Sequence, residues 1–231
     1  RNALGTDVEG YVIPLFHSQT AIAYNPAVVD PVPESYEELV TWIQEHPDRF
    51  GYNGVKGGMS GVAFTAGWLY WKTGMYPQLA AGPYDPAIEA NWRDIFSELK
   101  ALPATVTASN NDTLDRLNRG EIDMGPVWVD MFVLWKNEGR MDPNLRMKLI
   151  EPGMPGQPMY VVIPAKAAHP DLAIQFAEFI CSPEQQAKVI VDQQGWYPGI
   201  DPTRVLPNVS EEGKVKLFGD IPAEVLAQYG L

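Results

Sequence analysis

Strand-like runs alternate with amphipathic helical segments along most of the chain, and this alternation restricts the fold more than any other feature. The first run, β-branched and aromatic, spans residues 12–24 and has a polar break at 17–19. Ser35 and Glu38 follow, with the spacing of a capping box at a helix start. We therefore expect α/β layers with mostly parallel strands. The later expected elements are strands at 121–128, 147–150 and 159–163 and helices at 62–72, 112–119, 129–137, 170–180, 183–194 and 222–228.

Composition excludes several classes of function. The 231 residues contain 17 Lys plus Arg against 29 Asp plus Glu, a net charge of −12. No dense basic cluster is present to meet phosphates, so we expect no nucleic-acid partner and no docking on anionic lipid. The single cysteine, Cys181, excludes an internal disulfide and a multi-cysteine metal site. No apolar run reaches the ~20 residues of a membrane span, and no secretory signal opens the sequence.

Catalytic motifs are missing as well. The three histidines, His17, His46 and His169, accompany no Gly-x-Ser-x-Gly elbow and no His-Glu-x-x-His metal motif. We therefore expect a protein without catalytic residues, metal or cofactor, which acts by binding.

A glycine-rich turn at 57–61 precedes the helix expected at 62–72. Free backbone N–H groups at a helix start, together with the Ser60 hydroxyl, could hold an anionic or polar ligand group. The alternative is a tight loop that uses glycine only for positive φ angles. The sequence does not separate these two interpretations.

Two aromatic segments are also candidates for a binding site. Trp128 and Asp130 stand at a strand-to-helix junction, where α/β proteins form ligand crevices. A tryptophan beside a carboxylate suits a cationic or amphipathic ligand, and we favour this interpretation for Trp128 over a place in the core; Asp130 could equally be only a helix cap. Trp196 and Tyr197 place two large rings in a loop, where they face a ligand or plug the hydrophobic interior.

Two stretches carry a resemblance to a known family: Gly-Glu-Ile-Asp-Met-Gly at 120–125, and residues 163–186, where a strand ending in proline leads to a helix and then to Ser-Pro-Glu-Gln-Gln. With the order of the other elements, they resemble the bacterial extracellular solute-binding proteins of ABC importers, which have the type II periplasmic-binding fold. The likeness covers nearly the whole chain and is closest to the spermidine/putrescine-like branch.

The resemblance implies two lobes joined by crossing strands. Residues 1–24 match the first crossing segment, 25–157 one α/β lobe, and 158–231 the return strand and the C-terminal part of the other lobe. Family members carry an additional N-terminal half-lobe, so the resemblance implies a truncated form. An exposed apolar surface would then invite a homodimer or a separate half-lobe.

The same resemblance implies capture of a small polar ligand, containing an amine or both charges, and its delivery to ABC permease subunits in the periplasm. Polyamine-binding members place an acidic residue shortly after the return-strand aromatic, whereas Val161 and Val162 follow Tyr160 here. The alternatives are an enzyme that uses Asp130 and His17 on a similar scaffold, and a truncated binding or assembly module. The ligand positions implied by the resemblance are Phe16, His17, Ser18, Met59, Ser60, Trp128, Asp130, Tyr160, Trp196 and Tyr197.

Overall fold

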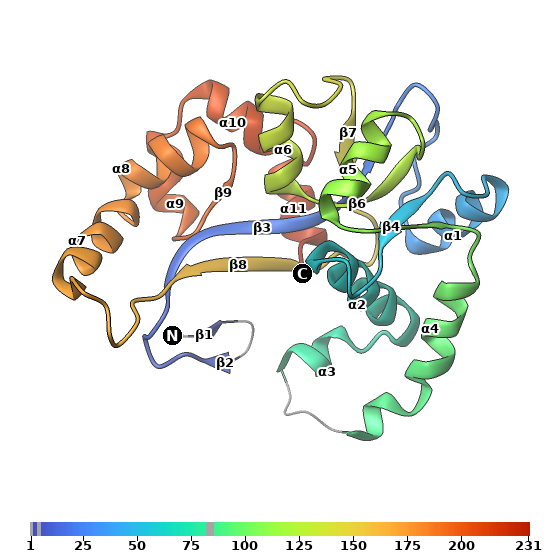
Figure 1. The fold of residues 1–231 in the computed structure, drawn as a ribbon, viewed down its shortest axis with the longest axis horizontal. Coiled ribbons are helices and arrows are strands. Elements are labelled where there is room, and N and C mark those ends of the chain that lie inside the picture. The colour runs from blue at the N-terminus through green and yellow to red at the C-terminus, as the bar shows by residue number, and fades with distance from the viewer. Residues whose placement is uncertain (1, 4–5, 82–85) are drawn as a thin grey trace. The chain divides into compact units, whose positions relative to one another are not determined.

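The computed structural model describes residues 2–3, 6–81 and 86–231, and the chain forms two compact units. Unit 1 comprises residues 1–18 and 157–219, and unit 2 comprises residues 19–156 and 220–231. Strands β3 (Ile13–Tyr24) and β8 (Gly156–Val161) pair with each other (Figure 1), and each has residues in both units. The α/β class expected from the sequence is confirmed.

The unit boundaries differ from the lobe boundaries implied by the resemblance, which assigned residues 220–231 to the same lobe as 158–219. The reason lies in backbone pairing within unit 2. The Leu231 N–H donates to the Met154 carbonyl at 2.9 Å, and the Met154 N–H donates to the Tyr229 carbonyl at 2.8 Å. Residues 220–231 therefore belong with unit 2.

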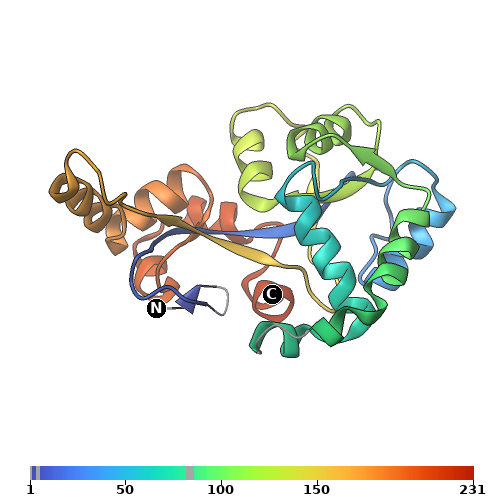
Figure 2. The ribbon, with the colours of Figure 1, turned by 60° about the horizontal axis from the view of Figure 1, so that its bottom comes forward.

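Unit 2 contains a mixed sheet surrounded by helices. Its elements are α1 (Tyr36–Glu45), β4 (Gly51–Asn53), α2 (Met59–Thr73), α3 (Tyr76–Ala81), the 3₁₀-helix η1 (Pro86–Asn91), α4 (Trp92–Ala101), β5 (Thr105–Thr107), α5 (Asn110–Asn118), β6 (Met124–Trp128), α6 (Val129–Asn137), β7 (Arg146–Lys148) and α11 (Ala223–Tyr229). Strand β4 pairs with β5 in parallel, and a parallel bridge between Phe50 and Met124 continues to β6. Figure 2 shows α2 beside α4, against which it packs.

The expectation of mostly parallel strands was wrong for the pairs that β3 forms. This strand runs antiparallel to β6, β7 and β9 (Tyr197–Pro198). Parallel pairing joins β4 to β5, and isolated parallel bridges join Phe50 to Met124, Ser35 to Glu151 and Met154 to Gly230. The strand β3 is not part of the helical crossovers that join β4, β5 and β6, so its direction is free to be opposite.

Unit 1 contains the remaining strands and helices. Its other elements are β1 (Asn2–Ala3), β2 (Thr6–Asp7), α7 (Pro170–Ile180), α8 (Pro183–Gln185), the π-helix η2 (Gln186–Gln193), α9 (Pro202–Val205), the 3₁₀-helix η3 (Leu206–Asn208) and α10 (Glu211–Phe218). Helix α7 begins at Pro170 and ends at Ile180, as the sequence predicts. The helix expected at 183–194 instead becomes π-helical after Gln185.

The polar break expected at 17–19 does not interrupt β3, because its polar groups find partners. His17 lies opposite Tyr197 in the ladder between β3 and β9. Gln19 is buried, and its side-chain amide donates to the Met154 carbonyl at 2.5 Å. A satisfied polar side chain is compatible with a buried strand.

Within the described residues, no helix is both long enough and apolar enough to cross a membrane.

Candidate functional site

The parallel strands of unit 2 direct three helix starts to one edge of the sheet. Helix α2 follows β4, α5 follows β5, and α6 follows β6. Carboxyl ends of parallel strands meet at the same edge, so Asn53, Thr107 and Trp128 end there together. We call this region the carboxyl edge of unit 2. Helix N-termini present unpaired N–H groups, so the edge is suited to acceptor groups of a ligand.

The glycine-rich turn before α2 has a structural role. Gly58 has a φ angle of 147°, a conformation that side chains rarely adopt. A Cβ atom on Gly61 would lie 1.7 Å from the Asn53 carbonyl oxygen, so only glycine lets α2 approach the end of β4 so closely. These two glycines support the tight-loop interpretation, whereas the neighbouring Met59, 47% exposed, still faces solvent.

Ser60 is fully buried in this turn, and its hydroxyl donates to Asn53 Oδ1 at 2.7 Å. Asn110 completes the network: its Oδ1 accepts from Asn53 Nδ2 at 3.1 Å and from the Ser60 N–H at 3.3 Å. The Ser60 side chain therefore ties α2 to α5 and to the end of β4. Its direct contact with a ligand stays a prediction.

Asn53 and Asn110, which hold the carboxyl edge together, are not among the residues predicted from the sequence. One local signal was available for each residue. Asn53 ends a strand-like run just before Gly54, and Asn110 follows Ser109, whose side chain caps α5 by accepting from the Asp112 N–H at 3.1 Å. Their pairing spans 57 positions in the sequence and is not visible in either segment alone.

The position of Trp128 is consistent with both interpretations of the sequence, a ligand-binding residue and a residue of the core. It ends β6, occupies the N-cap of α6, and is 7% exposed. Neither Trp128 nor Gly58, the N-cap of α2, has a side-chain oxygen that could cap its helix. The start of α6 thus has no side-chain cap, whereas at the start of α2 the Ser60 N–H already donates to Asn110 Oδ1 at 3.3 Å. Asp130 lies in the first turn of α6 and is partly buried.

Unit 1 brings a second set of candidate residues together on β3 and β9. The rings of Phe16 and Trp196 have centroids 4.5 Å apart, and His17 lies opposite Tyr197. Tyr197 is buried, 6.4 Å from the Phe218 ring, which favours its role as a plug under the loop. Trp196 is only partly buried and keeps a surface for contact. Ser18, the next candidate residue on β3, is buried.

Burial shifts two titratable groups of unit 1. It lowers the pKa of His17 below the ordinary value of 6.5, because the charged imidazolium loses hydration. Burial raises the pKa of Tyr160, on β8, because the charged tyrosinate loses hydration. Both side chains are therefore neutral at pH 7 and offer hydrogen bonds and ring surfaces. Such surroundings favour binding through polar and aromatic contacts.

The ten candidate residues thus form one group in each unit. Met59, Ser60, Trp128 and Asp130 belong to unit 2, and the other six belong to unit 1. His17 and Asp130, the pair required by the enzyme alternative, belong to different units. Across residues 2–3, 6–81 and 86–231, no cluster of three His, Cys, Asp or Glu side chains could hold a metal ion.

Solved structures of low sequence identity share this fold. The chain matches the substrate-binding protein of an ABC transporter from Agrobacterium tumefaciens with a TM-score of 0.62 and 15% identity, over 96% of this chain and 58% of that chain. It matches an ABC transporter structure from Clostridium perfringens with a TM-score of 0.67 and 19% identity, over 96% and 64%. A spermidine/putrescine ABC transporter substrate-binding protein from Streptococcus pneumoniae gives a TM-score of 0.62 and 18% identity, over 96% and 63%.

The chain therefore spans less than two thirds of the length of each of these structures. No curated protein sequence matches it significantly. A family model, described as bacterial extracellular solute-binding protein, matches residues 2–211. That match covers most of the chain, and the chain belongs to the bacterial extracellular solute-binding protein family.

Proposed function

We propose that this chain is the ligand-binding part of an ABC importer, located in the periplasm, which captures a small polar solute and delivers it to membrane permease subunits. The family match supports this proposal at the level of solute binding. The observation that carries the choice of ligand is the carboxyl edge of unit 2, where the start of α6, which has no side-chain cap, lies beside Trp128 and Asp130.

The ligand class we propose is amphoteric, with a carboxylate at one end and an amine at the other. Backbone N–H groups at helix starts bind a carboxylate, because the helix dipole adds to their hydrogen bonds. Asp130 and an aromatic face suit the amine. In unit 1, Phe16 and Trp196 form a separate aromatic surface.

The names of two solved proteins that share the fold support an amine-containing ligand. One is described as a GABA receptor, with 16% identity and a TM-score of 0.63, and the other is the spermidine/putrescine protein described above. GABA carries both charges, whereas putrescine carries two amines. The absence of an acidic residue directly after Tyr160 favours the first type.

The apolar face of unit 1 belongs to the same proposal. Leu172, Phe176 and Phe179 on α7 are exposed. We propose that an additional half-lobe packs there in the working protein, supplied by a longer form of the chain or by a separate chain, and that a second copy takes its place when no half-lobe is present.

Three four-carbon probes test the ligand class. GABA, putrescine and succinate have the same chain length and differ only in their end groups. We expect isothermal titration calorimetry to show GABA binding at least tenfold more tightly than either symmetric probe. Asp130→Asn should reduce GABA affinity about tenfold, because it removes the charge opposite the amine.

Asp115→Asn serves as a matched control, since Asp115 is an exposed carboxylate on α5 and the substitution makes the same change in charge. It should leave GABA affinity unchanged. Equal affinity for putrescine and GABA would contradict the amphoteric class. Native mass spectrometry of the purified protein, with no co-purified solute and no adduct with any probe, would contradict solute capture by this chain.

A further inference from the structure

Thr20 is a polar residue of β3 that lies in the interior of unit 2 and is not among the ten candidate ligand residues. It is fully buried, with 0% of its surface exposed. Its Oγ1 atom has no hydrogen-bond partner among residues 2–3, 6–81 and 86–231. The neighbouring Gln19, which is also buried, donates to the carbonyls of Thr20 and Met154. A buried hydroxyl without a partner costs free energy, and an acceptor from outside the chain would recover it.

The backbone of Thr20 forms its hydrogen bonds on the side of β3 away from β6. Its N–H donates to the Pro155 carbonyl at 3.1 Å, and its carbonyl accepts from Gln19 Nε2 at 3.1 Å. On the other side, Thr20 lies opposite Trp128 in the ladder between β3 and β6. Thr20 and Trp128 therefore form a non-hydrogen-bonded pair, the type of antiparallel pair in which the Cα atoms are about 4.5 Å apart and the side chains are closest.

This pairing places the Thr20 hydroxyl beside the start of α6. Residues directly opposite each other in a ladder have side chains on the same face of the sheet, so the Thr20 side chain lies next to that of Trp128. Trp128 is the N-cap of α6 and forms no side-chain cap. The first turn of a helix has backbone N–H groups without intrahelical acceptors and a positive potential. The unpartnered hydroxyl thus adjoins a helix start that also lacks a side-chain acceptor.

The chemistry of these two donors selects the group that binds there. Backbone N–H groups only donate, so an ammonium group finds no acceptor in them. A carboxylate has two oxygens, each with more than one acceptor position, and can accept from the helix start and from a hydroxyl at the same time. Both donors therefore favour a carboxylate over an amine.

From these features we infer that Thr20 is a further ligand-binding residue, whose hydroxyl donates to the ligand carboxylate at the start of α6. The inference rests on the proposed function and adds the residue that distinguishes a carboxylate from an amine at that end of the ligand. Thr20 and Trp128 are both buried, so the contact requires the Trp128 side chain to change its rotamer when the ligand enters. A hydroxyl bond to a charged acceptor is stronger than one to a neutral acceptor.

The test compares GABA with putrescine by isothermal titration calorimetry. Both probes have a four-carbon chain and an amine, and only GABA has a carboxylate. Thr20→Val keeps the shape of the side chain and removes the hydroxyl, so it should weaken GABA binding about tenfold and leave putrescine binding unchanged. Thr20→Ser keeps the hydroxyl and should retain GABA binding. Without ligand, Thr20→Val should not lower the urea midpoint of unfolding, because the hydroxyl has no partner in the described chain to lose.

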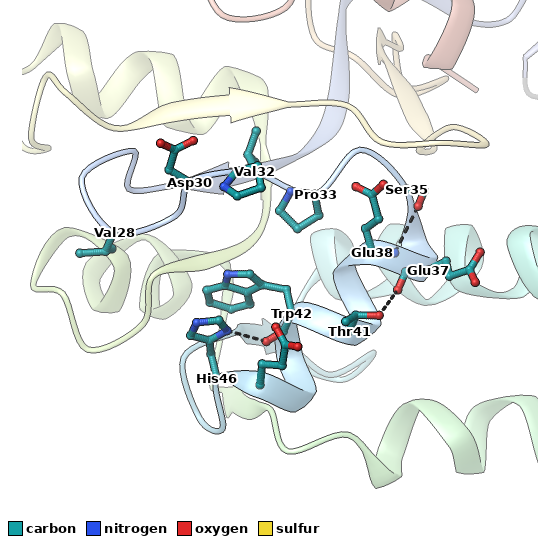
Figure 3. A pocket seen from close by; sticks show the side chains of 12 residues that line it. Val28, Asp30, Val32, Pro33, Ser35, Glu37, Glu38, Thr41, Trp42 and His46 are labelled. Carbon is teal, nitrogen blue, oxygen red and sulfur yellow. Dashed lines mark hydrogen bonds between the residues drawn. The ribbon is translucent and has the colours of Figure 1, made fainter.

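Thr41→Val is the matched control. Thr41 is an exposed threonine of α1 in a groove of unit 2, and its hydroxyl donates to the Glu37 carbonyl at 3.1 Å (Figure 3). This substitution should leave the affinity for both probes unchanged.

The outcomes separate the inference from the proposed function. If wild-type protein binds GABA and Thr20→Val binds it equally well, the inference is overturned and the amphoteric ligand class stands. Equal weakening of GABA and putrescine, loss of GABA binding in Thr20→Ser, or a lowered urea midpoint in Thr20→Val also overturns the inference alone. Wild-type protein that binds no GABA overturns both the inference and the proposed ligand class.

Discussion

Buried polar side chains position the loops of the carboxyl edge. Ser60 and Asn53 are both fully buried, and each has a hydrogen-bond partner in the network that Asn110 completes. A satisfied network of this kind fixes geometry, because any displacement leaves a buried polar atom without a partner. The sequence identified Ser60 by its position in the glycine turn. Its partners were not predictable, since the contact depends on how α5 packs beside α2.

At the same scale, His17 makes folding stability depend on pH. Its pKa is lowered by burial, so the folded protein binds the proton less readily than the unfolded chain. The stability that neutral His17 contributes is therefore present above pH 6.5 and is lost as the pH falls through the lowered pKa. We expect urea unfolding to show a free energy of unfolding that decreases from about pH 7.5 to about pH 5.5.

His17→Gln should flatten this dependence, because glutamine does not titrate. The control is His169→Gln, which changes an exposed histidine just before α7. A dependence that persists in His17→Gln, or that disappears in His169→Gln, would assign the effect to another group.

Local sequence rules predicted element boundaries well where a cap was present. Ser35 caps α1 by accepting from the Glu38 N–H at 3.2 Å, and Ser182 caps α8 by accepting from the Gln185 N–H at 3.4 Å. The rules did not predict the π-helix that follows Gln185. Its cause is tertiary: Gln186 is fully buried and bonds to three separate segments, which no helical periodicity reveals.

Gln186 therefore offers a test at the scale of elements. Its Nε2 donates to the carbonyls of Leu15 at 2.9 Å and Ile180 at 3.0 Å, and its Oε1 accepts from the Gly199 N–H at 2.8 Å. Gln186→Leu keeps the volume but leaves three backbone groups without partners. We expect a loss of about 2–4 kcal/mol in the free energy of unfolding, measured with urea.

Gln185→Leu is the matched control for that measurement, since Gln185 is only half-buried. It should change stability by less than about 0.5 kcal/mol. Equal effects of the two substitutions would show that the three bonds of Gln186 do not stabilise unit 1.

For the whole molecule, the family resemblance predicted the α/β fold and an exposed apolar surface. Helix α7 bears that surface on unit 1, because only Ala177 and Ile180 of this helix are buried. The sequence did not predict that residues 220–231 belong to unit 2. Their placement depends on backbone pairing with Met154, which leaves no pattern in the side chains.

The exposed face of α7 makes a prediction about assembly. Phe176 is 57% exposed and Phe179 is 56% exposed. We expect the isolated chain to self-associate as concentration rises in sedimentation velocity, since association buries both rings. Phe176→Glu with Phe179→Glu should shift the protein to monomer. Val215→Glu, at an exposed apolar position on α10, should leave association unchanged. A monomer at every concentration would contradict this prediction.

The connectivity of the two units also has a consequence for the order of folding. Residues 157–219 form an insertion within unit 2, which resumes at residue 220. During synthesis, residues 19–156 leave the ribosome before the insertion, but the backbone partners of Met154 and Gly156, at residues 229–231, emerge only after the whole insertion. Because a domain generally folds as a unit, its fold is complete only when such late partners are present. Unit 2 therefore completes its folding after most of unit 1 has been made, and a ribosome stalled within 157–219 would display unit 2 without its closing segment.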